Sequence, residues 1–197
     1  MKVALFLILL AVASSVAMLH MIAPDHWLPL SVISSGKGYS NRKKYSYSTA
    51  LGLGHAGASI LVAGIVFYLG LTLVHMYISY LVRTGQILLI IVGLYFIFNG
   101  YRESNIDTSV PENSALSVGI FPDLALIPIL ISGYSLSTYE LITILLVFAL
   151  LSTLFLCLMV FLAARGMGKI IARIPPKYMD YLIGAVLFLT AATIEFV

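Results

Sequence analysis

Two histidines and a carboxylate stand close together at the end of an otherwise apolar N-terminal run. His20, Asp25 and His26 flank Pro24, and His55 follows further along between glycines. Imidazole nitrogen with carboxylate oxygen suits zinc, copper, iron, cobalt or nickel, whereas magnesium and calcium sites are built from oxygens. Ionisable side chains are costly in lipid, so their presence in such a run is typical of function. The pattern predicts a metal site, with His55 as a further ligand or a supporting partner.

Proline supplies the geometry that this site needs. In a regular helix, positions 20, 25 and 26 spread around the cylinder and do not share a face. Pro24 lacks an N–H group, and its ring clashes with the carbonyl of His20; Pro29 has the same relation to Asp25. We therefore expect a broken helix whose side chains turn towards one point. Irregular backbone at membrane depth is tolerated only where it is packed in protein or lines a wet cavity.

The composition defines the class of protein. The chain has 197 residues, of which 61% are hydrophobic and 10% charged, and its mean hydropathy is +1.06. Soluble domains are about 25% charged, so we expect an all-α integral membrane protein with one polytopic domain, residues 1–197. The net charge of +3 comes from basic residues in short loops, which is a pattern of membrane orientation and predicts no nucleic-acid partner. Cys157 is the single cysteine, which argues against thiol redox chemistry.

Apolar runs predict six transmembrane helices. The loops after the first, third and fifth hold most of the lysine and arginine, so the positive-inside rule places both termini outside the cytoplasmic membrane. Residues 1–17 also fit a signal peptide with a small-residue cleavage site. Gly54, Gly57 and Ala58 predict the close approach of another backbone to the second helix. The predicted spans are 3–33 with its break, 47–74, 86–99, 118–132, 138–164 and 181–196.

The two halves of the chain share a pattern. Gly93 and Gly184 occupy similar segments of the third and sixth spans. Three helices per half is an odd number, so the halves must insert with opposite orientation, as in transporters with inverted repeats. We expect repeats at about 1–100 and 117–197 with helices 1 and 4 broken. Asp123 is then the proton or charge partner from the second half. The matching residues are Pro24, Asp25, Pro29 and Ser34 in the first half and Pro122, Asp123, Pro128 and Ser132 in the second.

Two motifs carry a family resemblance. His20-x4-Asp25-His26 resembles the H-x4-D-H motif of the nickel/cobalt transporter (NiCoT, NicO) family and its short UreH-like urease-accessory relatives. Leu53-Gly54-His55-Ala56 resembles the second motif of that family, and Gly119-Ile-Phe-Pro122 is similar to a degenerate form of a later one. The resemblance implies a transported nickel or cobalt ion held by His20, Asp25 and His26, with His55 as a further candidate. This chain is shorter than the larger members and lacks their histidine-rich loop.

The expected function is therefore a secondary transporter of a divalent transition metal, which is its substrate and not a cofactor. No nucleophile, base and orienting group occur together, so we expect no enzyme. The alternatives are an exporter of a small anion, amino acid or sulfite, and a membrane chaperone that passes metal to an enzyme. Transport direction, coupling ion and homo-oligomeric state are left open. Simpler roles also exist: His20 and His26 at the interface with Trp27, His55 in a hydrogen bond between helices, and Asp123 as a helix cap.

Overall fold

The computed structural model describes residues 2–74, 78–103, 122–167 and 176–194. These residues form helices and short connections, with no strand among them, so the predicted all-α class is confirmed. The helices are α1 (Lys2–Ile22), α2 (Pro24–Gly36), α3 (Asn41–Val74), α4 (Ile78–Glu103), α6 (Leu126–Ser132), α7 (Thr138–Leu162) and α9 (Pro176–Ile194), with the π-helical turn η1 (Ala163–Met167) after α7.

Four helical stretches are long and apolar enough to cross a bilayer. They are Lys2–Ser35, Asn41–Leu71, Arg83–Arg102 and Thr138–Met167, and a shorter apolar helix covers Asp180–Thr193. Large apolar side chains also cover the outside of the bundle. Such a surface is favourable in lipid and unfavourable in water. The chain is thus a multi-pass membrane protein. Examples of these outward side chains are Leu61, Ile65, Ile91, Leu94, Leu146, Leu150 and Leu154.

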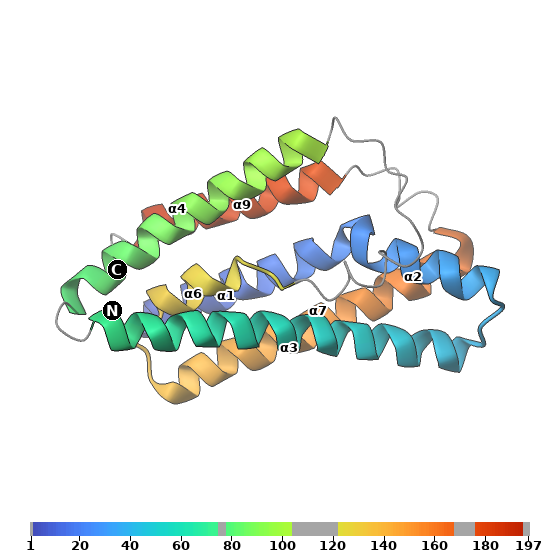
Figure 1. The fold of residues 1–197 in the computed structure, drawn as a ribbon, viewed down its shortest axis with the longest axis horizontal. Coiled ribbons are helices and arrows are strands. Elements are labelled where there is room, and N and C mark those ends of the chain that lie inside the picture. Colours follow the sequence, from blue (N-terminus) through green and yellow to red (C-terminus); the bar gives the residue numbers. More distant parts are fainter. Residues whose placement is uncertain (1, 75–77, 104–121, 168–175, 195–197) are drawn as a thin grey trace.

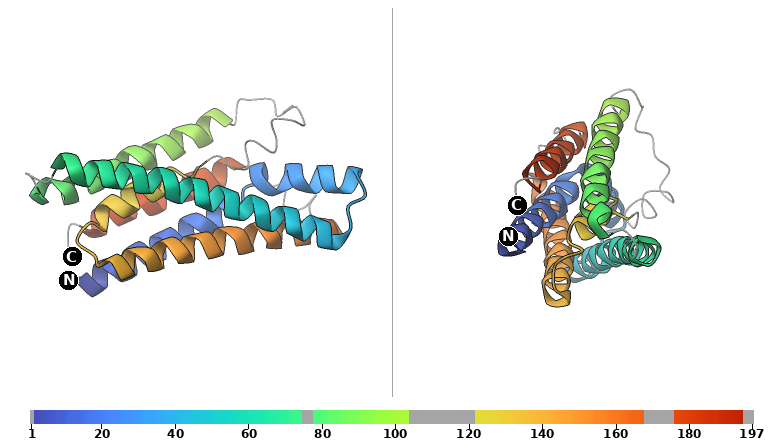
Figure 2. Two further views of the ribbon diagram at one scale, coloured as in Figure 1. Left: turned by 60° about the horizontal axis from the view of Figure 1, so that its bottom comes forward. Right: turned by 90° about the vertical axis from the view of Figure 1, so that its left-hand side faces the viewer.

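The helices form a bundle with two outer pairs. One pair is α4 with α9 and the other is α3 with α7, and α1 and α6 lie between them (Figures 1 and 2). Helix α1 packs on α7 and α9, whereas α6 packs on α3 and α4. The start of α1 and the end of α9 lie at the same end of the bundle (Figure 1).

The break predicted at Pro24 separates α1 from α2. Ala23 has φ −56° and ψ 137°, the extended conformation that proline favours in the residue before it. The indole Nε1 of Trp27 donates to the carbonyl of Ile22 at 3.0 Å, so an orphan carbonyl at the end of α1 is satisfied. Pro29 lies inside α2 and does not end it. The helix restarts at Pro24, and Pro29 removes one hydrogen bond from it without a second break.

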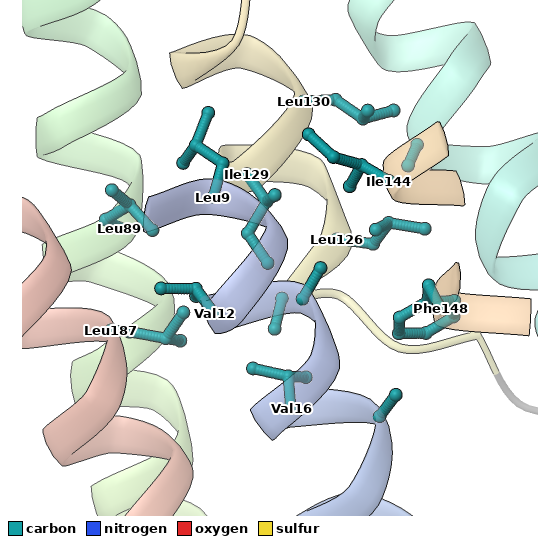
Figure 3. Close-up of a cluster of buried hydrophobic side chains, with 14 of the residues drawn as sticks. Leu9, Val12, Val16, Leu89, Leu126, Ile129, Leu130, Ile144, Phe148 and Leu187 are labelled. Atoms are coloured by element: carbon teal, nitrogen blue, oxygen red, sulfur yellow. The ribbon is translucent and has the colours of Figure 1, made fainter. Parts of the chain in front are cut away.

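Apolar side chains from six helices, α1, α3, α4, α6, α7 and α9, fill the space between the outer pairs (Figure 3). Leu9 and Val12 on α1 face Leu89 on α4 and Leu187 on α9, and residues of α6 and α7 close the other side. This packing fixes α1 along its length and thereby fixes the position of its last turn, which carries His20. The members drawn and labelled are Leu9, Val12, Val16, Leu89, Leu126, Ile129, Leu130, Ile144, Phe148 and Leu187.

Glycines allow the closest helix contacts. A Cβ added at Gly184 would lie 2.9 Å from the carbonyl oxygen of Gly93, so α4 and α9 touch through their backbones. A Cβ at Gly52 would lie 2.8 Å from the Cα of Thr153, which joins α3 to α7. No heavy atom of the described residues lies within 4 Å of a Cβ at Gly54 or Gly57. The predicted close approach therefore occurs at Gly52, because Gly54 and Gly57 face away from that packed side.

A capping box begins α7. The hydroxyl of Ser137 accepts from the Glu140 N–H group at 3.4 Å, and the Glu140 carboxylate accepts from the Ser137 N–H group at 2.8 Å. Ser137→Ala is expected to lower the free energy of unfolding by about 1 kcal/mol, because an orphan donor at the helix start loses its acceptor. Thermal unfolding in detergent measures this change. Ser135→Ala is the control, and an equal loss in both variants would contradict the cap.

Candidate metal centre

Three helices bring three histidines to one point. His20 lies in the last turn of α1, His26 in the first turn of α2 and His55 in α3. One ligand atom from each side chain can be chosen so that all three lie within 4.8 Å of one another. The ring centroids are 4.7 Å apart for His20 and His26, 5.3 Å for His20 and His55, and 5.0 Å for His26 and His55. Three of the four predicted ligands, His20, His26 and His55, therefore lie together.

The helix break makes the first contact possible. Six residues of continuous helix would place His26 about 120° around the helix axis from His20. Across the extended Ala23, their two Nε2 atoms instead lie 2.9 Å apart. At least one of these nitrogens must be an acceptor, because two N–H groups facing each other would repel. The accepting nitrogen carries no proton, as a histidine nitrogen must when it binds a metal ion.

The cluster lies in the interior of the bundle. His26 is 3% exposed and His55 is 1% exposed, whereas His20 is partly buried. Phe96 of α4, itself buried, directs its ring edge-on towards His20 with the centroids 6.5 Å apart. A cation bound here would be largely shielded from water, and its coordination would come from protein nitrogens.

Three imidazole side chains form a suitable ligand set for a transition-metal ion. Imidazole binds zinc, copper, nickel, cobalt and iron. Three protein ligands leave at least one coordination position open, in contrast to closed structural sites with four ligands. The three histidines can therefore hold an ion and still leave room for a further ligand, such as a carboxylate.

Asp25 lies in the first turn of α2, next to His26 in the chain. Its side chain is outside the described residues, so its role as the fourth predicted ligand stays a prediction. Trp27 is fully buried between α1, α3 and α7 residues, which argues against an interfacial role for the segment. His75 also lies outside the described residues.

Asp123 is connected to the cluster through Ser59 and is not a member of it. The backbone N–H of Asp123 donates to the Ser59 hydroxyl at 2.8 Å, and that hydroxyl donates to the His55 carbonyl at 2.8 Å. The Oδ1 atom of Asp123 accepts from the N–H of Ala125 at 2.9 Å, just before α6. Asp123 therefore caps this turn, and it also lies beside the turn of α3 that follows His55.

Ser59 contacts the His55 carbonyl and Phe96 contacts the His20 ring, and neither contact was predicted from the sequence. Ser59 lies four residues after His55, a spacing that predicts a shared helix face and a hydroxyl-to-carbonyl bond. No sequence spacing indicated Phe96, because its contact with His20 depends on how α4 packs. Cys157 contacts the hydroxyls of Ser48 and Thr49 where α7 meets α3.

Comparison of the chain with protein-family models, with curated proteins and with solved structures found no match. The resemblance to nickel/cobalt transporters therefore depends on the two histidine motifs.

Proposed function

We propose that this chain is a secondary transporter that moves a divalent transition-metal ion, nickel or cobalt first, across the cytoplasmic membrane. The observation that carries the proposal is the convergence of His20, His26 and His55 from three helix segments inside a membrane bundle. Ionisable groups at such positions mark substrate or ion pathways in membrane proteins. Asp25 is the proposed fourth ligand.

The broken helix favours transport over a purely structural metal site. Discontinuous helices in membranes place substrate sites at their breaks, where freed backbone groups and side chains meet. His20 and His26 flank such a break at Ala23. A structural site has no need of a break, since four ligands on regular helices can enclose an ion.

Helix packing supports two inverted repeats of three spans. In this proposal α1–α2 corresponds to the segment ending in α6, α3 to α7, and α4 to α9. Each half then packs its broken segment on the other half: α1 and α2 both contact α7, and α6, which follows Asp123 as α2 includes Asp25, contacts α3 and α4. Gly93 and Gly184, matched in sequence, also meet at the α4–α9 contact, as a two-fold axis would require. Asp123 then follows Pro122 as Asp25 follows Pro24.

Charge supports the proposed orientation. The positive-inside rule assigns the end of the bundle that is rich in lysine and arginine to the cytoplasm, and both termini to the outside. Lys2 and Arg83 belong to the opposite end. The described residues of the basic end are Lys37, Arg42, Lys43, Lys44, Arg102, Arg165 and Lys177.

Metal uptake by sealed proteoliposomes tests the proposal. The vesicles enclose a metal-sensitive dye and receive external Co²⁺ or Ni²⁺. We expect uptake by the unaltered chain, loss of most of it in His26→Ala, and retention in His75→Ala, which removes the fourth histidine. Equal uptake by the unaltered chain and His26→Ala would overturn the site.

The same experiment separates the alternatives. A membrane chaperone would bind Co²⁺ in detergent, in a manner that depends on His26, but would not fill the vesicles. An exporter of small anions would show neither binding nor metal uptake. Either result would overturn metal transport as the function.

A further inference from the structure

Asp123 is a buried carboxylate with one oxygen unaccounted for. The residue is 2% exposed, and Oδ1 accepts from the Ala125 N–H group. The other oxygen, Oδ2, is buried and has no hydrogen-bond partner among the residues that the structure describes. An ionised carboxylate at a buried position is costly unless it is paired, so an ionised Asp123 requires a cation close to this oxygen.

Hydrogen bonds hold Asp123 beside the helix turn that carries His55. The Ser59 hydroxyl accepts from the Asp123 N–H group and donates to the carbonyl of His55, both at 2.8 Å. Ser59 is completely buried, so no water competes for these bonds. The position of the carboxylate is therefore fixed relative to the histidine cluster and does not depend on a mobile side chain.

Another carboxylate buried in the described part of the chain has a different partner. Asp180 is 9% exposed and accepts from the Asn99 amide at 2.6 Å in the contact between α4 and α9. The described lysines and arginines lie near helix ends. The histidine cluster is therefore the place where a cation would complement Asp123.

We propose that Asp123 is the counter-charge of the histidine site and that it makes the site favour doubly charged over singly charged ions. This inference rests on the metal site proposed above. Neutral imidazoles bind Ag⁺ as well as Co²⁺ and supply no charge of their own. The Coulomb energy with a fixed carboxylate is twice as large for a divalent ion as for a monovalent ion at the same position. Asp123 thus adds selection by charge to selection by ligand type.

Binding of Co²⁺ and Ag⁺ to Asp123→Asn tests the proposal. Asparagine keeps a side-chain oxygen for the Ala125 N–H group and removes the charge. The background is Cys157→Ser, so that the thiol does not bind Ag⁺, and Asp25 is unchanged throughout. Calorimetry in detergent, at one pH and without chloride, gives both dissociation constants. We expect Co²⁺ binding to weaken about 100-fold and Ag⁺ binding about tenfold, since a nearby opposite charge shifts such equilibria by about one power of ten per unit charge.

Two control variants separate charge from structure. Asp123→Glu restores the charge and is expected to restore most of the preference for Co²⁺. Glu140→Gln removes the same charge at the start of α7, where glutamine also completes a capping box, and is expected to change neither constant. If Asp123 had only a structural role, Asp123→Asn would weaken the binding of both ions by the same factor.

Equal losses of affinity for the two ions in Asp123→Asn, or no loss for either, would overturn the proposal that Asp123 is the counter-charge. If His26→Ala abolishes binding of both ions while Asp123→Asn leaves their ratio unchanged, the histidine site stands and this inference fails. If the unaltered background binds neither ion, the proposed function and the inference fail together.

Discussion

His55→Ala is expected to weaken Co²⁺ binding by at least about 100-fold, because loss of an outer partner of a metal ligand alone costs about 10–100-fold. His55 is 1% exposed, and its ring lies close to both other histidines. Alanine would leave two imidazoles and a buried gap that no other described histidine reaches. The visible absorption of bound Co²⁺, titrated in detergent, gives the affinity and reports the coordination number.

His75→Ala is the matched control for this experiment, since it removes the histidine that is not among the proposed ligands. Thermal unfolding without metal should be measured for both variants, so that a folding defect is not mistaken for loss of a ligand. A His55→Ala protein that binds Co²⁺ as tightly as the unaltered chain would show that His55 only joins two helices.

Gly184→Leu is expected to lower the free energy of unfolding by about 1–3 kcal/mol, the range for overpacking a close contact. Even a Cβ at this position would lie 2.7 Å from Cγ1 of Ile97 and 2.9 Å from the carbonyl of Gly93. The carbonyl belongs to the backbone and cannot rotate away, so α9 must move outwards from α4. Thermal unfolding in one detergent measures the loss.

Gly57→Leu is the control, because no heavy atom of the described residues lies within 4 Å of its added Cβ. The two substitutions are chemically identical and both lie in apolar helices. Similar unfolding temperatures for the two variants would mean that α4 and α9 do not depend on the glycine contact.

Local chemistry explains what the sequence could predict. Pro24 lacks a donor and restricts the residue before it, so the break at Ala23 was predictable without knowledge of the fold. The same applies to the capping box of Ser137 and Glu140, whose spacing is visible in the chain. The proximity of His20 and His26, which flank Pro24, followed from that break.

Tertiary packing explains what could not be predicted in detail. His55 was named as a candidate from its neighbouring glycines, but its distance from His20 depends on how α1 and α3 pack on α7. Whether Gly52 or Gly57 takes the close contact depends on the rotation of α3 about its axis, which an almost uniformly apolar helix does not encode. The contact of Phe96 with His20 depends on how α4 is placed relative to α1.

Helices of the first half pack on helices of the second half, and this has a consequence for biosynthesis. All three clustered histidines are translated within the first 55 residues, yet α1 and α3 both pack on α7, which begins at Thr138. A nascent chain that has released only its first helices lacks the surface that holds His20 and His55 in register. Metal affinity should therefore arise late, after α7 has entered the membrane, which would protect the unfinished protein from capturing ions prematurely.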